Sequence, residues 1–205
     1  MSENYYFKIF KQNWELIMTL FLVAAVISLA VSVLQTSEYE AKLRVLVIQS
    51  QRGQMDPYRA AQSAEFLANL LSKVIYSSSF RAHVQESSFN FDRSILSGSS
   101  RNVIDVWKNQ ISAKVVGDTG ILEIDAYSHN RDQATELARA VANVFVQNGQ
   151  EYYGQDSEVQ IRILDDALAS DKPVRPNLWQ NLILGAFLGL VLGYLIGWLR
   201  ESRKF

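Results

Sequence analysis

The stretch that decides the fold is LWQNLILGAFLGLVLGYLIGWL, residues 178–199, near the carboxyl end of this 205-residue chain. These 22 residues carry no charge, and Gln180 and Asn181 are the only amide side chains among them. As a helix the stretch would measure about 33 Å, which matches a bilayer hydrocarbon core of about 30 Å. We predict a membrane-spanning helix, because a small domain rarely buries two helices that are apolar on every face.

A second apolar stretch, LIMTLFLVAAVISLAVSVL at residues 16–34, lies near the amino end and is also free of charge. It is longer than the apolar part of a signal peptide, and no A-x-A-like cleavage site follows it before Ser37. We therefore expect an uncleaved anchor. The predicted segments are a tail (1–15), a first span (16–34), a domain (35–177), a second span (178–199) and a tail (200–205).

Basic residues near the spans bear on which side of the membrane the domain occupies. Five lie on the side of the termini and four on the side of the domain. By the positive-inside rule this difference favours cytoplasmic termini and an exported domain, although a margin of one does not decide the orientation. The five are Lys8, Lys11, Arg200, Arg203 and Lys204; the four are Lys42, Arg44, Lys172 and Arg175.

Residues 35–177 alternate between apolar and polar side chains in several short runs, a pattern typical of strands with one wet face. Gly117 and Gly120 flank Asp118-Thr119 and predict a hairpin loop between two of these runs. The expected strands are Tyr39–Ile48, Ile111–Val116, Ile121–Tyr127 and Val159–Leu164. Such strands favour a mostly antiparallel sheet.

Helices should cover the dry face of that sheet, which gives an α+β domain. Asp56-Pro57 predicts a helix start, and apolar residues then recur at helical spacing up to Val74. A second stripe begins near Arg131, includes Ala134 to Phe145, and could continue towards Tyr153. Residues 101–110 read as a further helix, and 85–100 as a loop with a short helical turn.

The composition, and the catalytic and metal-binding motifs that are missing, argue against an enzymatic or metal-binding role for this chain. The net charge of −1 gives no footprint for nucleic acid, and the absence of cysteine excludes disulfides, thiolate zinc sites and a cysteine nucleophile. Phosphate-loop, H-E-x-x-H and G-x-S-x-G motifs are all missing. His83 and His129 have no partner at ligand spacing, so we expect ordinary surface or helix-end residues. No catalytic residue, metal site or cofactor is predicted.

Two acidic pairs could imitate a catalytic site. Glu123 and Asp125 share one strand face and resemble the paired acids of a metal-dependent transferase, but acids on a wet face are usually solvated, and we expect that here. Asp165 and Asp166 are adjacent on a strand end and should point to opposite faces. The sequence therefore predicts that this chain is not an enzyme.

Four glycines form a ladder in the second span: Gly185, Gly189, Gly193 and Gly197. Glycines four residues apart remove side chains from one strip of a helix, so that another helix backbone can approach closely in lipid. We predict that this strip is a helix-packing surface on which assembly of the protein in the membrane depends.

Two of the three prolines in the chain, Pro173 and Pro176, lie just before this span. Proline fixes φ and favours extended conformations in the residue before it, so Lys172–Asn177 should form a stiff, polyproline-like connector. Such a connector would set the orientation of the domain on the membrane.

The order of these features resembles the Wzz-type chain-length determinants, or polysaccharide co-polymerases, including the membrane adaptor subunits of bacterial tyrosine kinases. The resemblance rests on the segment AEFLANLL (64–71), Ala142-Asn143, the strand ending LDDA (164–167), and the proline segment joined to the glycine-rich span. Family members often have three prolines at P-x-x-P-x-x-P, and Ser170 stands here in place of the first. The domain is also shorter than in enterobacterial members.

The resemblance implies a protein of the bacterial plasma membrane with an extracytoplasmic domain and a homo-oligomeric state. It implies that the protein regulates the chain length and export of a capsule, exopolysaccharide or O-antigen, with any polymerase or kinase on a separate chain. Adaptor to a cytoplasmic tyrosine kinase is the alternative within the family. From other classes, a membrane-anchored sensor or a structural scaffold remains open.

Overall fold

The structure is a computed structural model that describes residues 10–49, 57–96, 101–154 and 159–202. It divides into two compact units, one made of Met1–Ser37 with Val174–Phe205 and the other of Glu38–Pro173. The first unit contains two apolar helices, α2 (Trp14–Leu34) and α8 (Leu178–Ser202). Both helices are long and apolar enough to cross a membrane.

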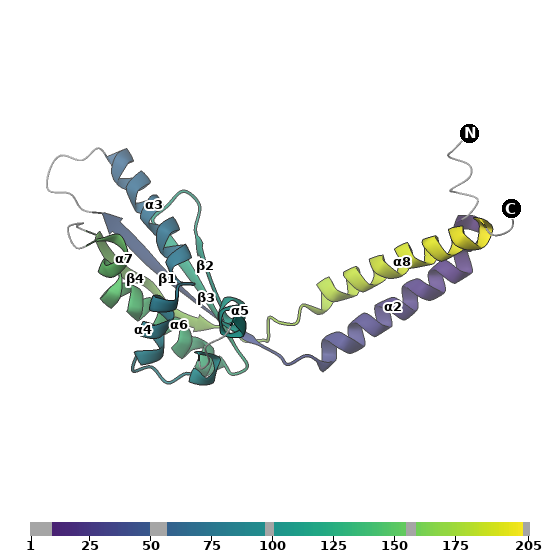
Figure 1. Ribbon diagram of the computed structural model, residues 1–205, viewed down its shortest axis with the longest axis horizontal. Helices are drawn as coiled ribbons and strands as arrows, with labels where there is room; N and C mark the ends of the chain where they lie inside the picture. The colour runs from purple at the N-terminus through teal and green to yellow at the C-terminus, as the bar shows by residue number, and fades with distance from the viewer. Residues whose placement is uncertain (1–9, 50–56, 97–100, 155–158, 203–205) are drawn as a thin grey trace. The chain divides into compact units, whose positions relative to one another are not determined.

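The second unit is built on a four-stranded sheet in the order β2-β3-β1-β4, with every neighbouring pair antiparallel (Figure 1). The strands are β1 (Tyr39–Gln49), β2 (Ile111–Val115), β3 (Ile121–Ser128) and β4 (Val159–Ala169). With the helices between β1 and β2 and between β3 and β4, this is the βαββαβ arrangement of ferredoxin-like domains. The predicted α+β class with an antiparallel sheet is confirmed.

One face of the sheet forms the core. In β1, Ala41, Leu43, Val45 and Val47 are at most 1% exposed, because they alternate with residues on the other face. Two 18-residue helices pack against this face. They are α3 (Pro57–Val74) and α6 (Arg131–Asn148). The helices therefore lie on the dry face, as predicted.

Shorter helices complete the unit: α4 (Ser78–Glu86), the 3₁₀ turn η1 (Arg93–Leu96), α5 (Arg101–Gln110) and α7 (Gln150–Tyr153). The Phe80 and Phe145 rings join α4 to α6, with centroids 4.5 Å apart. Trp107 of α5 is fully buried, and its indole Nε1 donates a hydrogen bond to the Ile75 carbonyl at 2.8 Å. These contacts pin the short helices to the core.

Gly120 shows why the β2–β3 hairpin needs a glycine there. The Val47 amide donates to the Gly120 carbonyl at 2.8 Å, and a Cβ on Gly120 would lie only 2.6 Å from the Val47 carbonyl oxygen. Gly117 has a φ of +57°, in the left-handed region that glycine adopts without strain. The predicted hairpin loop is present.

Several predicted boundaries were wrong. β4 continues to Ala169, well past Leu164, because β-bulges opposite Lys42–Val45 absorb the residues that break the alternation. The helix α4 was not anticipated. The second long helix stops at Asn148, and a separate short helix, α7, carries the chain to Tyr153. The expected cap at Asp56 lies outside the described residues.

Candidate functional site

The four ladder glycines lie on one face of α8, and all four are buried. A Cβ added at Gly189 would lie 2.7 Å from the Leu20 carbonyl oxygen, and one at Gly193 would lie 2.9 Å from Ile17 Cα. Real Cβ atoms essentially never approach heavy atoms closer than 3.0 Å. At these positions a side chain would therefore push the neighbouring backbone away.

The helix that occupies this strip is α2 of the same chain, which runs antiparallel to α8 (Figure 1). Gly185 faces Ser28, Gly189 faces Leu20 to Ala24, and Gly193 faces Ile17; at the far end, Gly197 faces Asn13. The sequence did not reveal which helix would pack here. The structure assigns the strip an intramolecular partner, and an association of copies through it stays a prediction.

Polar contacts reinforce one end of this helix pair. Ser28 Oγ donates to the Asn181 carbonyl at 2.6 Å, and Asn181 Nδ2 donates to Ser32 Oγ at 2.6 Å. Ser32 is 1% exposed, so its hydroxyl would be costly to bury without such a partner. In lipid these interhelical hydrogen bonds add to the close backbone packing. Sequence reasoning noted Asn181 only as an amide in an apolar span and missed this role.

The acids Glu123 and Asp125 are not solvated, contrary to the prediction. They are 7% and 1% exposed, although they lie on the sheet face opposite the helices. The antiparallel register explains this result, because it places three basic side chains directly beside them. Lys42 pairs with Asp125, Arg44 with Glu123, and Lys114 with Glu123 from the other side.

These basic side chains form close ion pairs with both acids. Arg44 donates from Nε and from NH2 to Glu123 Oε2 at 3.0 and 2.9 Å. Lys114 Nζ lies 3.1 Å from Asp125 Oδ2 and 3.3 Å from Glu123 Oε1. Lys42 Nζ lies 3.5 Å from a carboxylate oxygen of each acid. We call these five residues the charged cluster.

The charged cluster favours the ionised forms of Glu123 and Lys114. Burial alone raises the pKa of Glu123, but the hydrogen bond from Arg44 and the charges of Lys42 and Lys114 outweigh it, so the pKa is lowered. The hydrogen bond and charge of Asp125 raise the pKa of Lys114. A carboxylate locked in this way is a poor proton donor or acceptor near neutral pH. The cluster therefore stabilises the sheet.

The other residues that the sequence analysis considered lie outside both the glycine strip and the pair Glu123 and Asp125. His83 Nε2 lies 3.0 Å from Glu151 Oε2 and links α4 to α7. Asp166 pairs with Arg139 at 2.7 Å, and Asp165 lies 3.8 Å from Arg44. Pro173 and Pro176 fall between β4 and α8, where the structure assigns no helix or strand. Within the described residues no group of His, Asp and Glu side chains could hold a metal ion.

The family model described as Wzz, chain length determinant protein, matches residues 5–96, just under half of the chain. Over this stretch the chain is similar to the Wzz chain length determinant family. The resemblance stated from the sequence is thereby confirmed. No curated protein matches the chain.

The Wzz match begins before α2 and continues through β1, α3 and α4 to the end of η1. It therefore includes one helix of the pair and the central strand of the sheet, but not α8 with its glycines. Two helices able to cross a membrane, together with this match, make the chain a membrane protein that resembles this family.

The charged cluster makes the stability of the domain depend on pH. The lowered pKa of Glu123 contributes stability that is fully present above its ordinary value of 4.5 and is lost as the pH falls through the folded-state value. We expect the free energy of unfolding of the full chain in detergent to fall over that acid range. The measurement is urea unfolding followed by near-ultraviolet circular dichroism at a series of pH values.

Glu123→Gln should flatten that acid limb, because the variant has no carboxylate to protonate at this position. Glu86→Gln, at an exposed position on α4, is the matched control and should keep the wild-type slope. Parallel acid limbs for wild type and Glu123→Gln would contradict the assignment.

Proposed function

We propose that this chain is a non-enzymatic polysaccharide co-polymerase of the bacterial inner membrane, which regulates the length of a growing surface polysaccharide. The observation that carries the proposal is the match of residues 5–96 to the chain length determinant family. The paired membrane helices and the acids locked in the charged cluster are consistent with a scaffold.

In this proposal the protein is a scaffold beside a separate polymerase and does no chemistry itself. The chain connects the domain to the helix pair twice, through Ser37 and through the proline connector. Copies assemble into a homo-oligomer, and a separate polymerase builds a capsule, exopolysaccharide or O-antigen polymer beside it. The chain itself needs no cofactor and carries out no turnover.

A role as adaptor of a separate cytoplasmic tyrosine kinase is the second candidate. The compact domain favours it, because the longest helices of the domain, α3 and α6, have 18 residues and no long helical extension is present among the described residues. The two roles differ in cells. An adaptor is required for phosphorylation of the kinase, whereas a co-polymerase alone is required only for polymer length.

We further propose that residues 35–177 are extracytoplasmic and that both termini are cytoplasmic, as the excess of basic residues at the ends suggests. Because the chain has no cysteine, a single Ser87→Cys substitution provides a clean probe. We expect this thiol to react with a membrane-impermeant maleimide in intact spheroplasts, and Ser2→Cys to react only after lysis. The reverse labelling pattern would contradict the topology.

The function is tested by polymer length. Deletion of the chain should change the length distribution of the surface polysaccharide on gels, and re-expression should restore it. Pro173→Ala with Pro176→Ala should shift the distribution at matched protein levels, since the connector would no longer fix the domain relative to the membrane. Pro57→Ala, the third proline of the chain, is the control and should leave it unchanged. An unchanged distribution in the deletion strain would refute the proposal.

A further inference from the structure

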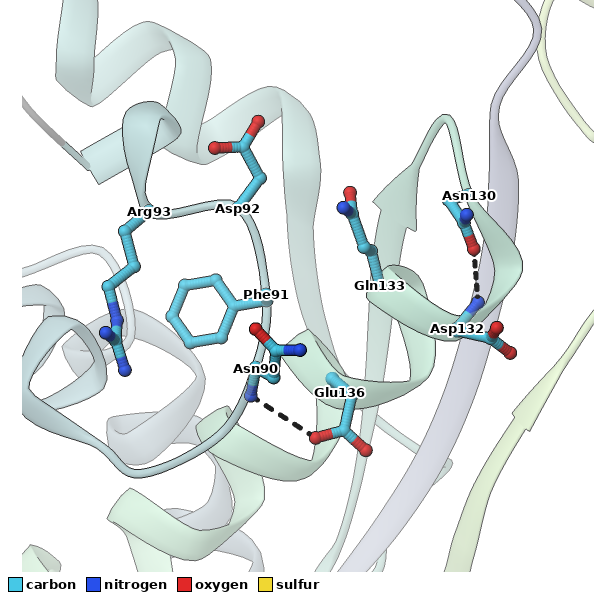
Figure 2. A pocket seen from close by; sticks show the side chains of 8 residues that line it. All are labelled: Asn90, Phe91, Asp92, Arg93, Asn130, Asp132, Gln133 and Glu136. Atoms are coloured by element: carbon cyan, nitrogen blue, oxygen red, sulfur yellow. Dashed lines mark hydrogen bonds between the residues drawn. The ribbon is translucent and has the colours of Figure 1, made fainter.

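Two polar hollows lie along one face of α6. The first, about 600 Å³, lies between residues 90–93 and the start of α6 (Figure 2). The second, about 360 Å³, lies between residues 83–89 and the later turns of the same helix. The helix contributes Gln133 and Glu136 to the first, and Asn143 and Gln147 to the second.

The spacing of these four residues places the two hollows along the same face of α6. Steps of three, seven and four residues keep side chains on the same face of a helix. From Gln133 to Gln147 the helix rises about 21 Å. The opposite wall is also shared, since residues 86–93 run from the end of α4 to η1 along both hollows. We call this surface the α6 groove.

The wall opposite α6 is held in place by its own hydrogen bonds. Arg93 donates to the carbonyls of Ser87 and Phe89 at 2.7 and 3.3 Å, which closes the loop on itself. The Asn90 amide donates to Glu136 Oε2 at 3.4 Å and links the loop to α6 (Figure 2). A groove with walls fixed in this way loses little freedom when it binds a ligand.

Several neutral amide side chains line the groove. No hydrogen bond within the described residues engages the side-chain amides of Asn90, Asn143 or Gln147. Each amide can donate and accept at once, which suits the neighbouring hydroxyls of a sugar ring. Half-buried Phe89 adds an apolar ring beside them, against which sugar C–H groups can pack.

The charged residues that line the groove restrict the kinds of sugar that it can bind. No lysine is among the described residues that line either hollow, and the first hollow has three carboxylates, Asp92, Asp132 and Glu136, against one guanidinium, Arg93. The Ser94 hydrogen bonds lower the pKa of Asp92 and keep it ionised. Phosphates and acidic sugars are therefore disfavoured there.

We propose that the α6 groove binds a segment of the growing polysaccharide, several neutral or amino sugars long, in an extended conformation. The inference rests on the proposed function, and it gives that function a place where the domain contacts the polymer. Binding along α6 would let the protein hold the chain while a separate enzyme extends it.

The test uses the full chain in detergent and oligosaccharides released by partial acid hydrolysis of the surface polysaccharide of the host strain. Binding is measured by isothermal titration calorimetry. Asn143→Ala with Gln147→Ala should weaken binding about tenfold or more, because two hydrogen-bonding groups are lost. Gln62→Ala with Asn69→Ala removes two exposed amides from α3 and should leave the affinity unchanged. Circular dichroism confirms that both variants are folded.

Equal affinity of the two double variants, or no binding by the wild-type chain, would overturn the α6 groove even if deletion of the chain changes polymer length. An unchanged polymer length in the deletion strain would contradict the proposed function instead. The two failures are thus distinguishable.

Discussion

The close approach of α2 to α8 is the contact on which the membrane part of the structure depends. Lipid tails are as apolar as leucine, so burial of apolar side chains gives two helices little reason to associate in a membrane. Here the association comes from backbone proximity along Gly185, Gly189 and Gly193 and from the hydrogen bonds of Asn181 with Ser28 and Ser32. The other faces of both helices carry exposed apolar side chains, as a bilayer requires.

In the domain, too, segments from the two ends of the sequence pack against each other. β1 is a central strand that pairs with both β3 and β4, so the first and last strands of the domain are neighbours. At their ends the Ser170 amide donates to the Glu40 carbonyl at 2.7 Å, and the Glu40 amide donates to Ser170 Oγ at 3.2 Å. The chain therefore enters and leaves the sheet at adjacent points. In the helix pair, the ends that lead to the domain are likewise joined, by Ser32 and Asn181.

Local patterns were sufficient to predict the layout of the chain. Uninterrupted apolar runs marked both long helices, and alternation marked the strands, because each pattern depends on neighbours along the sequence. Features set by long-range pairing were not predictable in this way. The burial of Glu123 and Asp125 follows from a register that brings Lys42, Arg44 and Lys114 beside them, and β4 passes Leu164 only because bulges accommodate its acidic residues. The α6 groove combines segments about 50 residues apart, and no motif in either segment identifies it.

The most direct test of the account asks whether α2 packs on the glycines of α8 within a single chain. Ser32→Cys with Asn181→Cys places two thiols in this cysteine-free sequence where a 2.6 Å hydrogen bond now joins the helices. In membranes, a short bis-thiol crosslinker should consume both thiols while the protein stays at the position of a monomer on a denaturing gel. Adding Gly189→Leu should abolish this crosslink, whereas Ala30→Leu, on an exposed face of α2, should not. Crosslinked dimers in place of the monomer, or a crosslink insensitive to Gly189→Leu, would contradict the account.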